Sequence, residues 1–142
     1  MVGEVIKIQE ADFSIDMILQ GLRARDNGAI VIFTGIVRGQ NDGYSTERLE
    51  IQVYEEMALD QLLKIRDEAL QQFDVHQINV IHRIGIINVS ENIVGIAVGA
   101  GHRDEAFNAC RYVLEELKKR VPLWKKEHTT DGQYWIEGQT YE

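Results

Sequence analysis

The residues most suited to chemistry are five cations that lie within nine positions, around the only proline of the chain. They are Lys118, Lys119, Arg120, Lys125 and Lys126. A bend at Pro122 can turn the chain back, so that the second group approaches the first. Two converging ammonium groups suit a phosphate, a carboxylate or a reacting carbonyl, and a desolvated lysine can donate a proton or act as an amine nucleophile. The alternative is a solvated helix end, since cations complement the dipole there.

A second candidate is the segment AGHRDE, residues 100–105. Small residues end a strand, and His102 and Arg103 then open a helix, whose free N–H groups favour an anion. Arg103 could add a bidentate fork, and His102 could exchange a proton near neutral pH. The alternative is that Asp104 and Glu105 complement the helix dipole while the two cations are only exposed.

A third candidate is FTGIVRGQN, residues 33–41, where an apolar strand delivers Arg38 to a glycine-rich loop. A solvated arginine on that loop is the alternative. His82 shares its strand parity with apolar residues, which favours a core histidine. The sequence contains no known zinc, nucleotide or serine-hydrolase motif, so we expect no metal site.

The elements that must position these residues follow from periodicity. Alternating or continuous apolar runs predict strands, a 3.6-residue period predicts helices, and Asp131-Gly132 predicts a hairpin. We expect strands at 2–8, 29–37, 49–54, 78–84 and 93–98, a loop at 38–46, and a final hairpin, whose alternation places Lys125 and Lys126 on opposite faces. We expect helices at 14–24, with Ser14 as the N-cap, at 56–73 and at 103–120. The core stripe predicted for the helix 56–73 is Leu59, Leu62, Leu63, Leu70 and Phe73. We expect 29–37 to be a buried central strand, and strand pairs between helices predict an α+β fold with a mixed or antiparallel sheet.

The bulk composition sets limits on function. With 142 residues the chain is predicted to form one domain, 1–142. A net charge of −8 argues against nucleic-acid binding. A lone cysteine, Cys110, cannot form an internal disulfide, and there is neither a long apolar run nor a signal-like start. We therefore expect a soluble cytoplasmic protein with no membrane association.

The two ends of the predicted helix 103–120 cannot serve one small ligand within one chain. His102 and Lys118 are sixteen residues apart, which corresponds to roughly 24 Å of helix. If both ends are functional, a second subunit must supply one of them, or there are two sites. We predict a two-fold homodimer in which the AGHR segment of one chain meets the lysines of the other.

Several motifs together resemble a known family. FTGIVR, VIHRIG, the GHR helix start and LKKRVPLWKKE followed by DGQYWIE are similar to the large, catalytic subunit of molybdopterin synthase, most clearly over residues 27–137. The resemblance implies an α+β fold with a hammerhead-like subdomain. It also implies a sulfurtransferase of molybdenum cofactor biosynthesis, which converts cyclic pyranopterin monophosphate (precursor Z) to molybdopterin without metal, ATP or another cofactor.

The resemblance further implies partners and site residues. Two sulfurs are installed as a dithiolene, and each arrives as a thiocarboxylate on the C-terminal Gly-Gly tail of a small ubiquitin-like subunit. A homodimer of large subunits forms the centre of a heterotetramer. The family's pocket falls on Ile36, Val37, Arg38, His102, Arg103, Lys118, Lys125, Lys126 and Glu127. Lys118 and Lys125 are the catalytic candidates. Gln139 stands near the position of an arginine that is thought to reach the neighbouring pocket in some members.

Two other classes stay open from the residues alone. The chain could be a non-catalytic subunit that binds an anion or a partner through the same basic pocket. It could instead be an enzyme that acts alone on a carbonyl substrate through a Schiff-base lysine. RNA binding fits least, because aromatic residues other than Trp124 are not interleaved with the cations.

Overall fold

The first sheet of the molecule has four strands. In the computed structural model, which describes residues 5–136, their order is β1 (Ile6–Gln9), β5 (Val75–Arg83), β7 (Asn92–Ala100) and β2 (Ala29–Ile36). β1 runs parallel to β5, and the other neighbours are antiparallel. The mixed sheet and the α+β class predicted from the sequence are therefore confirmed.

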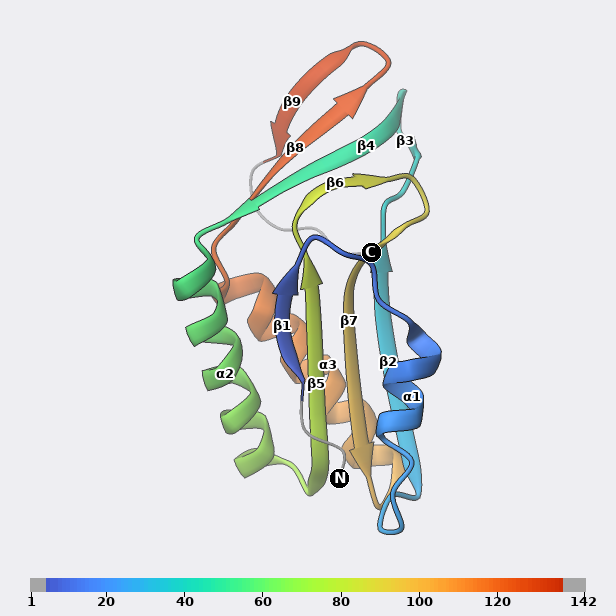
Figure 1. Cartoon of the computed structure of the whole chain (residues 1–142), viewed down its shortest axis with the longest axis vertical. Coiled ribbons are helices and arrows are strands. Elements are labelled where there is room, and N and C mark those ends of the chain that lie inside the picture. Colours follow the sequence, from blue (N-terminus) through green and yellow to red (C-terminus); the bar gives the residue numbers. More distant parts are fainter. Residues whose placement is uncertain (1–4, 137–142) are drawn as a thin grey trace.

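Helices cover both faces of this sheet. The long helices α2 (Glu55–Gln72) and α3 (Arg103–Arg120) pack on one face, and the short α1 (Ile15–Gly21) packs on the other (Figure 1). The predicted N-cap of α1 is confirmed, since the Ser14 hydroxyl accepts a hydrogen bond from the backbone N–H of Met17. α3 is unbroken over its 18 residues.

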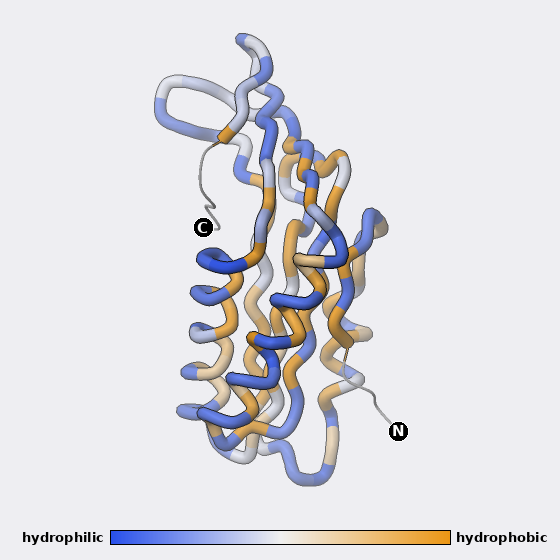
Figure 2. Tube along the Cα trace, turned by 90° about the vertical axis from the view of Figure 1, so that its left-hand side faces the viewer, coloured by the Kyte–Doolittle hydropathy of each residue, from blue (hydrophilic) through white to orange (hydrophobic). Residues whose placement is uncertain are grey.

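The inward face of α2 differs from the one that the leucine spacing predicts. The buried residues are Ala58, Leu62, Ile65 and Ala69, whereas Leu59 is 38% exposed. Of the predicted stripe Leu59, Leu62, Leu63, Leu70 and Phe73, Leu62 is buried and Leu70 and Phe73 pack against the core. The prediction was wrong for Leu59 and overlooked the two alanines. The apolar sides of both long helices still face the sheet (Figure 2).

A second sheet, of five strands, lies across one end of the first (Figure 1). Its longest strand is β4 (Tyr44–Val53), which pairs with β3 (Gln40–Asn41), β6 (Gly85–Asn88) and β8 (Leu123–Thr129). β8 also pairs with β9 (Gly132–Ile136) across the predicted hairpin. This sheet corresponds to the subdomain that the resemblance implied.

Three sequence predictions about strands were wrong. The segment 29–37 is not central: within the described residues β2 pairs only with β7, so it is an edge strand. The segment 38–46 is not a loop, because β3 and the start of β4 form a hairpin in which Gly43 has a φ of +80°. β6 was overlooked, since four residues after Arg83 are too short a run to separate from the preceding strand.

Candidate functional site

Lys125 is a buried cation in the second sheet. It is only 2% exposed, and its neighbours on the adjacent strands are Ile51 and Ile136. Strand alternation turns Lys125 toward the interior, where apolar neighbours replace water. This burial, together with the charge of Lys118, lowers the pKa of Lys125 to about 8.

Lys118 approaches Lys125 from the last turn of α3. The charge of Lys118 lowers the pKa of Lys125, so the bend at Pro122 does bring the two groups together, as the sequence predicted. Lys118 is half-buried, so it can be reached from outside. The pair therefore combines one accessible cation with one enclosed cation that can release its proton near neutral pH.

A groove leads along the molecule to Lys118. It has a volume of about 560 Å³ and lies between the edge strand β2 and helix α3. The β2 wall is apolar, with Val31, Ile32 and Phe33. The α3 wall mixes apolar and polar side chains, which are Phe107, Cys110 and Leu114 with Asn108, Arg111, Glu115 and Lys118. A groove of this kind that reaches a cation can take an extended chain whose terminus is anionic.

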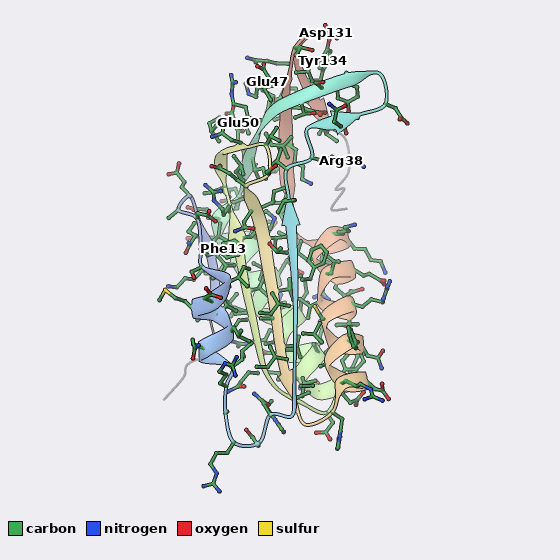
Figure 3. All side chains as sticks on the ribbon, turned by 90° about the vertical axis from the view of Figure 1, so that its right-hand side faces the viewer. Phe13, Arg38, Glu47, Glu50, Asp131 and Tyr134 are labelled. Carbon is green, nitrogen blue, oxygen red and sulfur yellow. The ribbon has the colours of Figure 1, made fainter. Side chains whose placement is uncertain are left out.

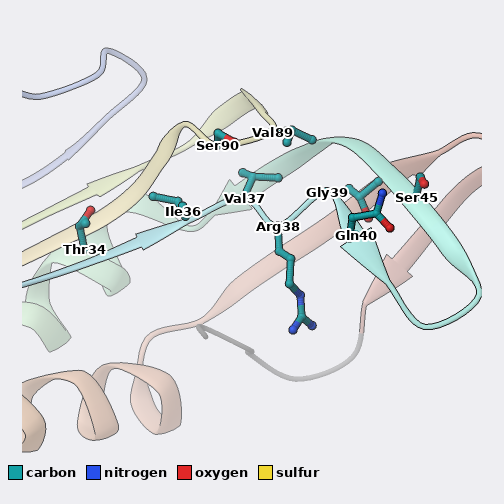
Figure 4. Close-up of a pocket in the computed structure, with 10 residues that line it drawn as sticks. Thr34, Ile36, Val37, Arg38, Gly39, Gln40, Ser45, Val89 and Ser90 are labelled. Carbon is teal, nitrogen blue, oxygen red and sulfur yellow. The ribbon is translucent and has the colours of Figure 1, made fainter.

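Ile36, Val37 and Arg38 line a second cavity, of about 700 Å³, where the two sheets meet (Figures 3 and 4). Val37 is buried and contributes packing, whereas Ile36 is 49% exposed after an irregularity in the β2 ladder. Figure 4 shows the Arg38 side chain extending toward the side on which α3 continues into β8. Arg38 thus lies at this cavity, and its charge acts on Tyr44, the hydrogen-bond partner of Glu127.

Glu127 and Lys126 lie on opposite faces of β8. Glu127 is buried on the same face as Lys125, and it accepts hydrogen bonds from the hydroxyls of Thr46 and Tyr44. Lys126 lies on the outer face, with its Nζ 5.0 Å from the ring centroid of Trp135. Glu127 therefore joins the lysine pair, and Lys126 does not.

Two members of the basic cluster have structural partners. Arg120 donates to both carboxylate oxygens of Glu68 at 2.6 and 3.0 Å, which ties α3 to α2, and it also contacts Glu116. Lys119 lies 3.5 Å from Glu116 on the exposed side of the helix. Lys119 therefore fits the alternative of a solvated helix end, whereas Arg120 joins two helices.

His102 and Arg103 lie at the other end of α3. Both are exposed, and His102 occupies the N-cap position of the helix without a side-chain capping bond. The unbroken helix keeps them about 24 Å from Lys118 within one chain. The structure thus brings together Arg38, Lys118, Lys125 and Glu127, and it separates His102 and Arg103 from them. Gln139 lies outside the described residues.

His82 is a core histidine, as its parity predicted. Its Nδ1 lies 2.8 Å from the carbonyl oxygen of Arg83, and burial lowers its pKa to about 4. Within residues 5–136 no group of three or more His, Cys, Asp or Glu side chains is arranged to hold a metal ion. No helix in that part of the chain is long and apolar enough to cross a membrane.

Comparison with known proteins identifies the family of this chain. Residues 8–120 match the family model described as "MoaE protein". A protein of Pyrococcus abyssi (strain GE5 / Orsay), named molybdopterin synthase catalytic subunit, is 43% identical over 130 residues, which cover 92% of this chain and 88% of that protein. A protein of Bacillus subtilis (strain 168) with the same name is 37% identical over 136 residues, which cover 96% of this chain and 87% of the relative.

The fold agrees as well. The crystal structure of molybdopterin synthase from Staphylococcus aureus superposes with a TM-score of 0.86 at 36% identity, covering 91% of this chain and 94% of that one. A subunit complex of the molybdopterin-converting factor from Helicobacter pylori, at 18% identity and a TM-score of 0.78, shares the fold. The resemblance noted in the sequence is confirmed: this chain belongs to the MoaE protein family.

Proposed function

We propose that this chain is the catalytic subunit of a molybdopterin synthase, which transfers sulfur from a thiocarboxylated carrier protein to cyclic pyranopterin monophosphate. The observation that carries the proposal is the buried Lys125 beside Lys118, at the end of the groove between β2 and α3. The names of the relatives support the same activity. The cytoplasmic location expected from the sequence stays a prediction.

The groove between β2 and α3 suits the carrier's C-terminal tail. Glycines at the end of a tail have no side chains to exclude them from a narrow channel. The thiocarboxylate at its tip would meet Lys118, whose charge offsets that of the anion. Arg38, at the neighbouring cavity, would bind the cyclic phosphate of the pterin.

Lys125 suits proton transfer at the reacting carbon. As the carrier sulfur forms a bond to a side-chain carbon of the pterin, the bond from that carbon to oxygen breaks, and the leaving oxygen needs a proton. An ammonium group with a pKa of about 8 is protonated at neutral pH, yet it releases its proton more readily than an exposed lysine. Water then hydrolyses the acyl–sulfur link and returns the carrier as a carboxylate.

The direct test is turnover. The purified chain, precursor Z and a thiocarboxylated carrier protein should yield dithiolene product, and Lys118→Ala or Lys125→Ala should abolish it while the fold is retained. Lys119→Ala is a matched control, because Lys119 is adjacent to Lys118 and points to Glu116 instead. Near-normal rates in both test variants would reject the assignment.

We also propose that two chains share each site, which would give His102 and Arg103 a role. The support is the roughly 24 Å that separates them from Lys118 along α3. Such a dimer would stand at the centre of a heterotetramer with two carrier subunits. The Helicobacter pylori structure is a complex of subunits 1 and 2 of its converting factor, which is consistent with a carrier partner.

Mixing two inactive variants tests the shared site. In a heterodimer of Arg103→Ala and Lys125→Ala chains, one site carries both lesions and the other carries none. If half of the dimers are mixed, about a quarter of wild-type activity returns, by the symmetry of an isologous dimer. No recovery in a mixture that has been shown to exchange subunits would reject the shared site.

The Schiff-base alternative has one observation in its favour, which is the low pKa of Lys125. Borohydride treatment with precursor Z, in the absence of carrier, distinguishes it from the proposal. We expect no covalent adduct, and mass-spectrometric detection of pterin on Lys125 would favour the alternative.

A further inference from the structure

A chain of hydrogen bonds surrounds Glu127, next to the lysine pair. The Thr46 hydroxyl donates to one carboxylate oxygen, and the Tyr44 hydroxyl lies 3.4 Å from the other. Thr46 in turn accepts a hydrogen bond of 2.8 Å from the side-chain amide of Asn41. Because Asn41 occupies one lone pair of the Thr46 oxygen, the hydroxyl proton is directed at Glu127.

These contacts join the β3–β4 hairpin of the second sheet to its strand β8. Asn41 and Tyr44 belong to the β3–β4 hairpin, whereas Glu127 lies on β8. Thr46 is only 4% exposed and Glu127 7%, so few water molecules compete for these bonds. The two hydroxyls therefore fix the carboxylate in one orientation.

The network faces the proposed substrate site. Thr46 lines the same cavity as Arg38, and the Arg38 charge acts on Tyr44. Glu127 and Lys125 are two positions apart on the same face of β8, which corresponds to roughly 7 Å. A fixed anion thus lies among cations that would bind the phosphate end of the substrate.

A carboxylate in this position suits the other end of the ligand. Each of its oxygens has two lone pairs, and the hydroxyls use one on each. The remaining lone pairs need hydrogen-bond donors, which a phosphate lacks. The pyrimidine edge of a pterin offers two, an amide N–H and an amine. Such neighbouring donors match the two oxygens of one carboxylate.

We propose that Thr46 and Tyr44 are positioning residues, which hold the Glu127 carboxylate so that it accepts hydrogen bonds from the N–H edge of the pterin. This inference rests on the proposed function. It assigns recognition of the pterin ring to Glu127 and its two hydroxyl donors, separately from the lysine chemistry.

The test compares Thr46→Val, Thr46→Ser and wild type in the complete reaction with precursor Z and the thiocarboxylated carrier. Valine keeps the shape of threonine without the hydroxyl, and serine keeps the hydroxyl. We expect Thr46→Val to raise the KM for precursor Z about ten-fold with kcat within about two-fold, because one charge-assisted hydrogen bond is lost in recognition. Thr46→Ser should stay close to wild type.

Thr129→Val is the matched control. Thr129 is a buried threonine on the same strand face, but its hydroxyl donates to the backbone oxygen of Gly132 in the hairpin. Thr129→Val should lower the free energy of unfolding and leave the KM for precursor Z unchanged. If Thr46→Val does not fold, Tyr44→Phe replaces it as the test, because Tyr44 is 40% exposed and the fold tolerates its change. The KM of Tyr44→Phe for precursor Z should rise about three-fold.

The outcomes separate the two proposals. An unchanged KM in Thr46→Val, or equal losses in Thr46→Val and Thr46→Ser, overturns the positioning role while wild-type turnover stands. If wild type itself neither binds precursor Z in equilibrium titration nor turns it over, the proposed function fails first.

Discussion

Replacing Lys125 with methionine should stabilise the folded protein at neutral pH. Methionine has a similar length and carries no charge, so it removes the cost of burying an ammonium group between Ile51 and Ile136. The pKa of Lys125 falls from 10.5 to about 8, which corresponds to about 3 kcal/mol at 1.36 kcal/mol for each pH unit. We expect Lys125→Met to gain roughly that free energy of unfolding at pH 7 and to lose all turnover.

The gain should disappear as the pH rises. Below pH 8 the lysine is charged in both the folded and the unfolded state, so the whole cost is present. Between pH 8 and 10.5 the folded state releases its proton first, and wild-type stability rises toward that of the variant. Above pH 10.5 both states are neutral and the two proteins should be equally stable.

Urea unfolding at matched protein concentration, from pH 7 to 10.5, measures this difference. Lys126→Met is the control, since Lys126 lies on the outer face over Trp135 and should change stability by no more than about 1 kcal/mol at any pH. Equal stability of wild type and Lys125→Met at pH 7, or a gain that does not depend on pH, would refute the account of Lys125 as a desolvated cation.

Three further predictions concern the scaffold. Burial lowers the pKa of His82 from 6.5 to about 4, so between these pH values only the unfolded state takes up the proton and the wild-type free energy of unfolding should fall by about 3 kcal/mol. In urea unfolding, His82→Phe should remove this dependence on pH. In Gly28→Ala the new Cβ would lie 2.5 Å from the backbone oxygen of Gly101, so we expect urea unfolding to show a loss of about 1–3 kcal/mol, and an unchanged midpoint would contradict the close approach. Burial raises the pKa of Cys110 from 9.0 to about 11, so at pH 8 iodoacetamide should alkylate the folded protein about 100-fold more slowly than the protein unfolded in urea. Equal rates would show that the thiol is accessible in the folded protein.

The sequence predicted the parts of the fold that strong local signals specify. The 3.6-residue period of α3 and the proline after it located a helix that ends at Arg120, and alternation in β8 correctly placed Lys125 and Lys126 on opposite faces. The order of the strands within a sheet leaves no such local signal in the sequence. An apolar run such as AIVIFTGIV has the same pattern in a central strand and in an edge strand that a helix covers, so the position of β2 could not be predicted.

The candidate site was predicted only in part, for a related reason. The bend after α3 made the approach of Lys118 and Lys125 predictable. The environment of Glu127 depends on Thr46 and Tyr44, which are about eighty residues away in the chain and lie in a segment that was predicted to be a loop. The Asp42-Gly43 dipeptide in that segment is a hairpin signal that could have revealed the two strands carrying them.

The most direct test of sulfur transfer follows the sulfur itself. A defined amount of thiocarboxylated carrier is mixed with precursor Z and this chain, and mass spectrometry counts the carrier molecules converted to carboxylate while the dithiolene product is quantified. The account predicts two carriers consumed for each product formed, and no conversion with Lys118→Ala or without precursor Z. Carrier that stays thiocarboxylated with the wild-type chain, or that is hydrolysed equally without the pterin, would contradict it.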